Sequence, residues 1–457
     1  MDDSVERMGH RMESRKIAVV GAGVAGIGAA WLLSQRHEVT LFEANDRLGG
    51  HSNTVACGMP EGEIPVDTGF IVYNEPNYPQ LSALFRHLDV PTRESDMSFA
   101  FAATDIDLEY AGSGLGTLFA QRRNLFRPRF WGMVRDILRF NREANERLAS
   151  GRSHHQSLGE LLDELGMGDA FRRYYLLPMS AAIWSCPQDI MLRFPARSFL
   201  RFFYNHGLIQ LQDRPQWRTV AGGSREYIQR MRPAIQHVHT GTPVRSVRRL
   251  ASGVGLAGDA GELGEFDAVV MAAHGDQTLA MLDQPSEAEA RLLGAFGYQA
   301  NDAWLHTDPA LMPKRRAVWS SWNHLTARSV DGRQPVSVTY WMNRLQSLAT
   351  DTDVMVTLNP LRQPAPETVI RRQRYDHPVF DQAAVAAQAA LPGIQGVDRI
   401  WYCGSYHGYG FHEDAFSSAV RVAERLGAPP PWAGDARAAD SHVPLNTPAP
   451  LGAGATP

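Results

Sequence analysis

The residues best suited to chemistry in this sequence are three glycines and a glutamate near its start. Gly21, Gly23 and Gly26 are spaced as GxGxxG directly after the apolar run 16–20, and Glu43 follows 22 residues after the first glycine. In this pattern the first glycine makes a tight turn, the second admits a pyrophosphate and the third lets a helix lie close to its strand. The N-terminus of that helix offers N–H groups to phosphates, and the carboxylate can bind ribose hydroxyls. The spacing therefore predicts a dinucleotide-binding site.

A second glycine pair follows in Arg47-Leu48-Gly49-Gly50-His51. It resembles the extended fingerprint of FAD-binding flavoproteins of the amine oxidase and phytoene desaturase type. In that family the arginine and both glycines lie against the diphosphate and the flavin side, an extension that NAD enzymes do not usually carry. The resemblance implies FAD as the cofactor. It extends the expected FAD-binding set to Ala25, Ala44, Arg47, Gly49, Gly50, His51, Thr68, Gly69, Phe70 and Val244.

A third anchor lies near the other end of the chain, in the segment GSYHGYGFHED at 404–414. It resembles the closing motif of the same family, in which a glycine-rich turn between a strand and a helix presents N–H groups to the cofactor. The predicted strand is 399–403, and the predicted helix continues to about Leu426. The resemblance assigns to FAD the residues Gly404, Ser405, Gly410, Phe411, His412 and Glu413.

The chain that positions these motifs should fold into more than one compact unit, because 457 residues are more than a single hydrophobic core usually accommodates. We expect an α/β fold: a Rossmann-type, amine oxidase-like FAD-binding domain with an inserted α+β substrate domain. The FAD domain is expected from segments 15–112, 216–290 and 391–427. The substrate domain is expected from a helical part at 113–215 and an antiparallel sheet at 291–390, with strands at 303–306, 317–322, 336–342 and 354–358. A flexible leader at 1–14 and a disordered tail at 428–457 complete the expected division.

The resemblance covers about residues 15–427. It is closest to a bacterial group of FAD-binding oxidoreductases, through segments such as VDTGFIVYN, AAIWSCP, NHGLIQL and GYGFHED. Similar sequence forms the N-terminal half of plant cyclopropane fatty acid synthases, and related flavoproteins are implicated in desaturating methyl-branched fatty acids. The resemblance thus implies a substrate related to lipids.

Composition excludes several other classes. The net charge of −4 and the pI near 6.5 give no general attraction to nucleic acid. The three cysteines, Cys57, Cys186 and Cys403, are too few and too scattered for a disulfide framework or a metal site, and they indicate reduced thiols in a reducing cytosol. The leader lacks the apolar segment of a signal peptide. The sequence also contains no run of about 18 apolar residues, so we expect no membrane-spanning helix. We expect a cytoplasmic protein.

Two departures from the resembling family bear on the reaction. Standard flavin amine oxidases place a lysine near flavin N5, but the corresponding stretch 298–306 contains none. The family's Gly-Glu is replaced by Gly404-Ser405. Both changes disfavour rapid oxidase chemistry and favour a dehydrogenase, a desaturase or an isomerase without net redox change. Candidate proton acceptors beside the flavin anchor are His407, Tyr409 and His412, with Tyr340 approaching from the substrate sheet. Binding of the cofactor or simple packing is the alternative for each.

The substrate domain contains two further patterns. Aromatic residues gather at 194–204, which predicts either an apolar tunnel or a packed helical core. Residues 121–142 carry seven arginines and one aspartate, with aromatic residues interleaved among them. This segment predicts either peripheral contact with an anionic inner-membrane surface or a solvated helix face.

The leading hypothesis is a FAD-dependent oxidoreductase that removes hydride from a C–H bond of an apolar, lipid-derived substrate. A flavin amine oxidase is the alternative, and a non-catalytic flavoprotein partner of a lipid-modifying enzyme is a third. The sequence does not define the electron acceptor or the oligomeric state.

Overall fold

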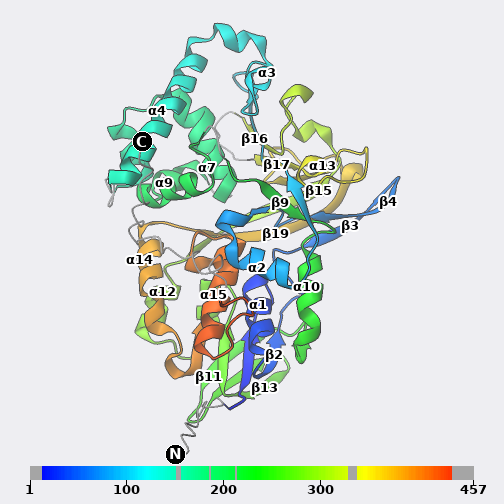
Figure 1. Ribbon diagram of the computed structural model, residues 1–457, viewed down its shortest axis with the longest axis vertical. Coiled ribbons are helices and arrows are strands. Elements are labelled where there is room, and N and C mark those ends of the chain that lie inside the picture. Colours follow the sequence, from blue (N-terminus) through cyan, green and yellow to red (C-terminus); the bar gives the residue numbers. More distant parts are fainter. Residues whose placement is uncertain (1–12, 151–155, 185–186, 211–213, 328–336, 435–457) are drawn as a thin grey trace, which may run out of the picture.

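The computed structural model describes residues 13–150, 156–184, 187–210, 214–327 and 337–434. Figure 1 shows a half that contains the parallel sheet and the N-terminal region at the bottom, and a half that contains a second sheet and most of the long helices at the top. The chain crosses between them several times. The expected fold class, α/β with a Rossmann-type parallel sheet and an inserted α+β domain, is confirmed.

The lower half is built on a five-stranded parallel sheet in the order β10-β2-β1-β14-β20. Its strands are β1 (Lys16–Val20), β2 (Glu38–Phe42), β10 (His237–His239), β14 (Ala268–Met271) and β20 (Ile400–Tyr402). The first two strands were predicted at these bounds. Such a sheet is buried on both faces, which explains why β1 and β14 are continuous apolar runs.

Helix α1 (Val24–Leu33) is apolar on every side and buries all ten residues. It packs between the sheet and α15 (His412–Arg425), and a Cβ added at Gly28 would lie 2.7 Å from the Phe416 ring. The close approach of α1 and α15 joins the first and last motifs of the chain. The remaining helices of this half are α2 (Pro79–His87), α10 (Arg225–Met231), α11 (Gly275–Met281), α12 (Glu287–Leu293) and α14 (Gln382–Ala390).

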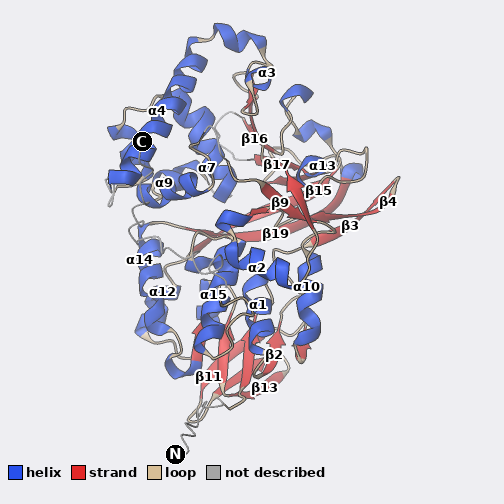
Figure 2. Cartoon of the chain, viewed as in Figure 1, coloured by secondary structure: helices blue, strands red, loops and turns tan. Residues whose placement is uncertain are grey.

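The upper half is built on a seven-stranded sheet in the order β19-β15-β18-β17-β16-β7-β8 (Figure 2). The strands are β19 (Val369–Val379), β15 (Gly297–His306), β18 (Met355–Leu358), β17 (Ser337–Trp341), β16 (Trp322–Thr326), β7 (Phe99–Ala103) and β8 (Leu108–Ala111). Neighbours are antiparallel except β16 and β7, which are parallel.

Helices cover the top of this half, as the periodicity of 113–203 predicted. They are α3 (Leu115–Leu118), the 3-10 turn η2 (Arg122–Phe126), α4 (Pro128–Ser150), α5 (Leu158–Glu164), α6 (Asp169–Phe171), the π-helical η3 (Arg172–Leu176), α7 (Leu177–Trp184), α8 (Gln188–Leu192) and α9 (Ala196–Asn205), and α13 (Met342–Leu345) follows β17. Among the described residues, none of the helices combines the length and apolar character needed to span a membrane.

Smaller sheets complete the described fold. The hairpin of β3 (Thr54–Met59) and β4 (Gly62–Asp67) follows the second glycine pair, and β5 (Tyr73–Asn74), β9 (Trp217–Val220) and β6 (Thr92–Ser95) form another sheet. A meander of β11 (Val244–Arg249), β12 (Val254–Gly258) and β13 (Gly261–Phe266) lies beside the parallel sheet.

Several expected boundaries differ from the structure. Residues 99–111 were expected in the first FAD segment, but they belong to the seven-stranded sheet because β7 pairs with β16. The strand expected at 317–322 is wrong: residues 316–318 form a 3-10 turn, and β16 begins only at Trp322. The strand β19 was not predicted.

The two ends of the described chain also bear on the expected boundaries. The indole of Trp432 is buried, stacks on Trp31 at 6.1 Å and donates to Gln80 Oε1 at 2.8 Å, so residues 428–434 are ordered rather than part of a tail. Residues 1–12 of the expected leader and 435–457 of the expected tail lie outside the described residues.

Two of the three cysteines lie among the described residues. Cys57 and Cys403 are buried free thiols, and burial raises their pKa values to about 11 and about 12. Cys186 lies outside the described residues. These buried thiols stay protonated and unreactive at neutral pH.

Candidate active site

A cavity of about 1360 Å³ extends from the glycine motif of the lower half into the helices of the upper half. It exceeds the roughly 300–1,000 Å³ of ordinary small-molecule pockets. One end is lined by the β1–α1 turn and Glu43, and the other by α3, α4 and α7. A cavity of this volume has room for a dinucleotide and a second molecule.

The first glycine motif forms a cradle at one end of the cavity. Gly21 has a φ of +98°, which a side chain would strain, and a Cβ added at Gly26 would lie 1.7 Å from the Gly21 carbonyl oxygen. A Cβ added at Gly23 would meet no atom within 4 Å, and Gly23 lines the cavity. No side chain caps the N-terminus of α1. The turn therefore leaves space and free N–H groups where a pyrophosphate is expected.

Glu43 lies at the C-terminal end of β2 and faces the same cradle. Its buried carboxylate accepts the Ala22 N–H at 2.7 Å through Oε2 and the Asn45 N–H at 2.9 Å through Oε1. These bonds fix the carboxylate and leave lone pairs for the ribose hydroxyls. Ala25, Ala44 and Val244, which were predicted to bind FAD, also line the cavity.

The second glycine pair closes over the first. The Gly49 N–H donates to the Ala22 carbonyl at 2.8 Å, and Gly23 and Gly49 form an isolated parallel bridge. Arg47 Nη2 donates to the Gly50 carbonyl at 2.8 Å, while Nη1 is buried and has no acceptor among the described residues.

Some of the residues predicted to bind FAD line the cavity, and others lie behind its wall. Gly50, His51, Thr68, Gly69 and Phe70 line the cavity. Arg47, Gly49 and Gly26 lie behind that wall. The arrangement fits FAD, with the phosphates expected at the glycines and the isoalloxazine expected near His51 and Phe70.

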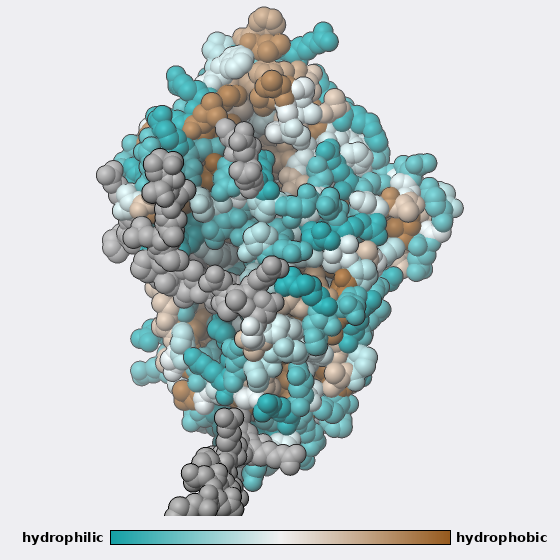
Figure 3. Space-filling view, in the orientation of Figure 1, coloured by the Kyte–Doolittle hydropathy of each residue, from teal (hydrophilic) through white to brown (hydrophobic). Residues whose placement is uncertain are grey.

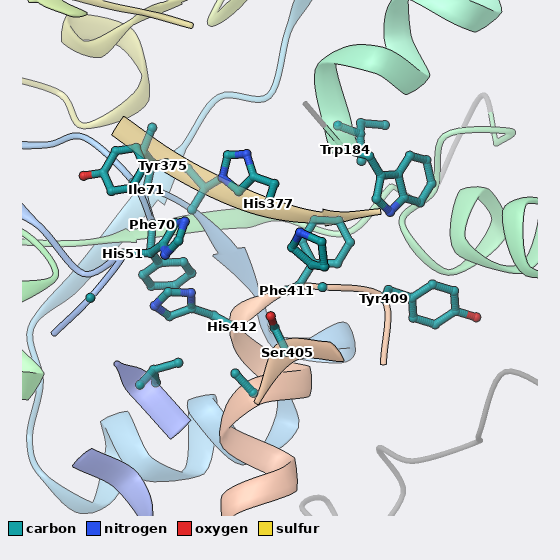
Figure 4. Close-up of a pocket in the computed structure, with 18 of the residues that line it drawn as sticks. His51, Phe70, Ile71, Trp184, Tyr375, His377, Ser405, Tyr409, Phe411 and His412 are labelled. Carbon is teal, nitrogen blue, oxygen red and sulfur yellow. The ribbon is translucent and has the colours of Figure 1, made fainter. Parts of the chain in front are cut away.

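Four histidines line the middle of the cavity: His274 and the three that Figure 4 labels, His51, His377 and His412. The rings of His51 and His377 lie 5.2 Å apart, and the ring of His412 stacks on Phe70 at 3.9 Å. Burial, and then the neighbouring imidazoles, hold the pKa of His51 well below its usual range. The cluster is therefore neutral at physiological pH.

His412 is held in place by two hydroxyl groups. Its Nε2 lies 2.9 Å from Ser52 Oγ and 3.2 Å from the Tyr227 hydroxyl, and these two hydroxyls also bond to each other. Burial lowers its pKa to about 3. His412, predicted as a cofactor-binding and catalytic residue, lines the cavity, but it is a weak base at neutral pH.

The ring of His377 is oriented by a side-chain amide. Its Nδ1 accepts from Asn301 Nδ2 at 3.0 Å, and the amide orientation is fixed because Asn301 Oδ1 accepts from Asn359 Nδ2 at 2.7 Å. The neutral ring therefore carries its hydrogen on Nε2. Burial lowers the pKa of His377 to about 4.

The other catalytic candidates are placed differently. Tyr340 and Tyr409 line the cavity. The Tyr409 hydroxyl is buried without a hydrogen-bond partner among the described residues, and Figure 4 shows its ring directed away from His412. His407 does not line the cavity, and its ring packs against that of Tyr406 at 4.7 Å.

Glu413 was expected to bind FAD but caps another helix. Its carboxylate accepts the N–H groups of Gln80 and Leu81, both at 2.9 Å, at the N-terminus of α2. These are orphan donors that a buried helix end must satisfy. The remaining predicted residues of the closing motif, Gly404, Ser405, Gly410 and Phe411, line the cavity.

The far arm of the cavity is apolar and aromatic. The Phe202 ring lies 4.6 Å from Trp184, 5.0 Å from Phe411 and 3.9 Å from His206. Beyond them the wall is formed by Leu118, Val134, Ile137, Leu138, Tyr175, Met179 and Ile183. This supports a tunnel, although Phe194, Phe199 and Phe203 of the same aromatic group are packed in the core.

Sequence reasoning missed Tyr375, His377 and Trp184. The first two are two residues apart on β19, so they project from one face of the sheet toward the cavity. Alternation in that strand was the available signal. No lysine lines the cavity among the described residues. In the same part of the chain, no group of three or more His, Cys, Asp or Glu side chains is arranged to hold a metal ion.

Comparisons with known proteins agree with this geometry. The family model described as flavin containing amine oxidoreductase matches residues 24–427. A protein of Mycobacterium tuberculosis named flavin-containing monoamine oxidase AofH is 28% identical over 261 residues, 54% of each chain. The 4,4'-diapophytoene desaturase of Staphylococcus aureus is 59% identical over 39 residues, 8% of each chain. The chain thus spans about half or less of the length of these curated relatives.

Solved structures show the same fold. A fatty acid isomerase from P. acnes that produces CLA superposes with a TM-score of 0.63 at 14% identity, over 90% of this chain and 98% of that one. Putrescine oxidase bound to putrescine gives a TM-score of 0.64 at 16% identity, over 91% and 99%. At these identities the likeness concerns the fold.

Proposed function

Because the chain belongs to the family of flavin-containing amine oxidoreductases, we propose that it removes hydride from a C–H bond of an apolar, lipid-derived substrate, as a dehydrogenase or desaturase. Family membership makes the protein an oxidoreductase with FAD as its cofactor. FAD, when bound, supplies the hydride acceptor, and the protein supplies orientation and a dry site. The substrate class is the proposal.

The observation that carries the proposal is the apolar arm of the cavity. Its wall runs from Trp184 and Phe202 to Val134 and Leu138, and these are aromatic or aliphatic side chains. An apolar ligand gains free energy by leaving water for such a wall, at about 25 cal/mol per Å² of buried area. A chain-like hydrocarbon fits a long arm better than a compact amine does.

The charged groups of the cavity support the same substrate class. Asp96 lines the cavity, but Ser98 and Ser321 donate to its carboxylate and Arg344 pairs with it at 3.0 Å. Asp376 pairs with Arg374 at 3.0 Å. An ammonium group entering the arm would therefore meet carboxylates that already have partners.

The residues of the middle cavity are assigned to orientation rather than to proton removal. The low pKa values of His377 and His412 make both rings poor bases at neutral pH. Burial raises the pKa of Tyr409, so its hydroxyl stays protonated. These neutral groups position substrate and cofactor, and a reaction without net redox change, as in an isomerase, uses the same arrangement.

The alternative function is a flavin amine oxidase. It is favoured by the relative named as a monoamine oxidase. The absence of lysine from the described cavity wall weakens it. The desaturase relative matches over only 39 residues and therefore does not decide between them.

The test is flavin absorbance of the purified holoprotein under anaerobic conditions. Total lipid extract is added first and a panel of primary amines second, with free FAD in the same mixtures as the control. Bleaching by lipid alone supports the proposal and directs product analysis by mass spectrometry. Bleaching by amines alone overturns it in favour of the amine oxidase. If neither bleaches the flavin and no lipid is isomerised, a non-catalytic partner of a lipid-modifying enzyme becomes the better account.

A further inference from the structure

Four large apolar side chains are exposed together on the outermost elements of the upper half. They are Leu115 of α3, Leu125 and Phe126 of η2, and Trp131 of α4, and we call them the apolar tip. Phe126 is 84% exposed and Leu115 is 76% exposed. Trp131 is joined to η2 because its Nε1 donates to the Leu125 carbonyl at 2.9 Å. Gathered exposed apolar side chains mark an interaction site, and Figure 3 shows apolar atoms gathered at this end of the molecule.

The apolar tip is continuous with the cavity. Along α4, Val134 and Leu138 follow Trp131 by three and seven residues, which places the three side chains on one face of the helix. Val134 and Leu138 line the cavity, and Leu138 is also 53% exposed. Leu118 of α3 lines it from the other side. An apolar stripe thus leads from the tip to the mouth of the tunnel.

The charges around the tip are mainly positive. Arg122 and Arg129 are exposed and form no ion pair with another described residue. Arg123 pairs with Asp107, and Arg127 donates to the Asp107 carbonyl at 3.2 Å. The remaining nearby groups are Asp105, which is exposed, and Glu109, which is buried and paired with Arg315 at 2.9 Å. The unpaired guanidiniums favour a negatively charged partner.

We propose that the apolar tip docks on an anionic lipid bilayer, with Phe126, Leu115 and Trp131 among the headgroups and Arg122 and Arg129 against the lipid phosphates. The stripe on α4 then delivers an acyl chain from the leaflet into the cavity without passage through water. Delivery rests on the proposed function, whereas docking does not.

A bilayer fits the tip better than a second copy of this chain does. Two copies related by a two-fold axis would bring together two patches that each carry the exposed Arg122 and Arg129, and like charges across an interface are costly. The apolar tip lies at the top of the long axis of the molecule, at the far end from the lower half (Figure 1). A small projecting patch of apolar and cationic side chains is typical of peripheral membrane contact.

The test is sedimentation of the full-length holoprotein with phosphatidylglycerol-containing vesicles and with pure phosphatidylcholine vesicles. The double variant Arg122→Ser/Arg129→Ser should bind the anionic vesicles about 30-fold more weakly, since each cation near such a surface contributes about 1 kcal/mol. Phe126→Ser with Leu115→Ser should weaken binding by at least about tenfold. The matched controls are Arg36→Ser/Arg291→Ser and Val397→Ser, which change exposed residues of the cofactor half and should leave binding unchanged.

Equal binding of the wild type to neutral and anionic vesicles, or no binding, overturns the proposal. Concentration-dependent dimerisation that is lost in Phe126→Ser overturns it in favour of an interface between copies. Sedimentation is independent of the reaction. If the tip variants lose binding to vesicles but any lipid reduces their flavin in detergent as it does for the wild type, docking and the proposed function both stand. If wild-type flavin is unaffected by lipid while docking holds, only the proposed function fails.

Discussion

The substitutions Gly23→Ala and Gly26→Ala should separate cofactor binding from folding within one motif. An added Cβ at Gly23 meets nothing within 4 Å, and its φ of −64° and ψ of −179° are allowed for alanine. The apoprotein should therefore keep its stability, or gain about 0.4–1 kcal/mol through a less flexible unfolded chain. The methyl group occupies the space that the pyrophosphate needs. Losing one charge-assisted hydrogen bond of about 1.5–3 kcal/mol weakens FAD binding by about 10- to 150-fold.

Gly26→Ala should behave in the opposite way. Its Cβ would lie 1.7 Å from the Gly21 carbonyl oxygen, so the backbone of the turn must move. We expect the apoprotein to lose at least the roughly 1–3 kcal/mol of ordinary overpacking, and FAD binding to fall as a consequence. Gly58→Ala is the matched control, because its Cβ also meets nothing within 4 Å and Gly58 lies on β3 outside the cavity wall.

The assay has two readouts. Thermal unfolding of the deflavinated proteins reports the fold, and titration with FAD followed by quenching of flavin fluorescence reports binding. Wild-type FAD affinity in Gly23→Ala would refute the placement of the pyrophosphate at this turn. If the Gly23→Ala apoprotein were as unstable as the Gly26→Ala apoprotein, the open space inferred beside Gly23 would be refuted.

Four further predictions follow from single sites. Glu43→Ala should lower FAD occupancy of the purified protein by about tenfold or more, and unchanged absorbance at the flavin band would remove the ribose assignment. Trp432→Ala should lower the free energy of unfolding by about 3 kcal/mol in urea titrations; no change would mean that the stacked indole is not stabilising. Burial lowers the pKa of His377 to about 4 and of His412 to about 3, so both rings are neutral from about pH 5 to 8, and stopped-flow flavin reduction should show no inflection near about pH 6.5. Burial raises the pKa of Glu413 from 4.5 to about 7. The contribution of Glu413 to the free energy of unfolding is therefore full below pH 4.5, the pKa in the unfolded chain, and is lost as the pH rises to about 7. If the stability of the wild type, relative to Glu413→Gln, rises across this pH range, the burial argument is wrong.

The cofactor end of the site could be predicted because local backbone geometry dictates it. A turn between a parallel strand and a helix admits a phosphate only with glycine at Gly21, Gly23 and Gly26, and such requirements appear directly as spacing. Glu43 followed from the length of one strand-helix-strand unit. The structure puts all four where the spacing required.

The substrate end depends on contacts between distant segments, which spacing does not encode. β19 pairs with β15 at the edge of its sheet and reads VIRRQRYDHPV, so arginines hide the alternation that carries Tyr375 and His377. Glu413 matched the acidic position of the family's motif, but only the fold shows that its carboxylate caps a helix 333 residues earlier in the sequence. Trp432 lies in an Ala- and Pro-rich stretch, where composition favoured disorder over a single buried ring.

The order of strands in the parallel sheet has a consequence for how the protein is made. The central strand β1 pairs with β2 and β14, and the outer strand β20 comes from Ile400–Tyr402. At about 5–20 residues per second, a ribosome needs roughly 20–80 seconds between synthesis of the first strand and the last.

Throughout that interval α1, which is apolar on every side, lacks the cover of α15. The cavity wall likewise combines the turn after β1 with residues of the 404–412 segment. The cavity is therefore complete only after β20 and the start of α15 have been made.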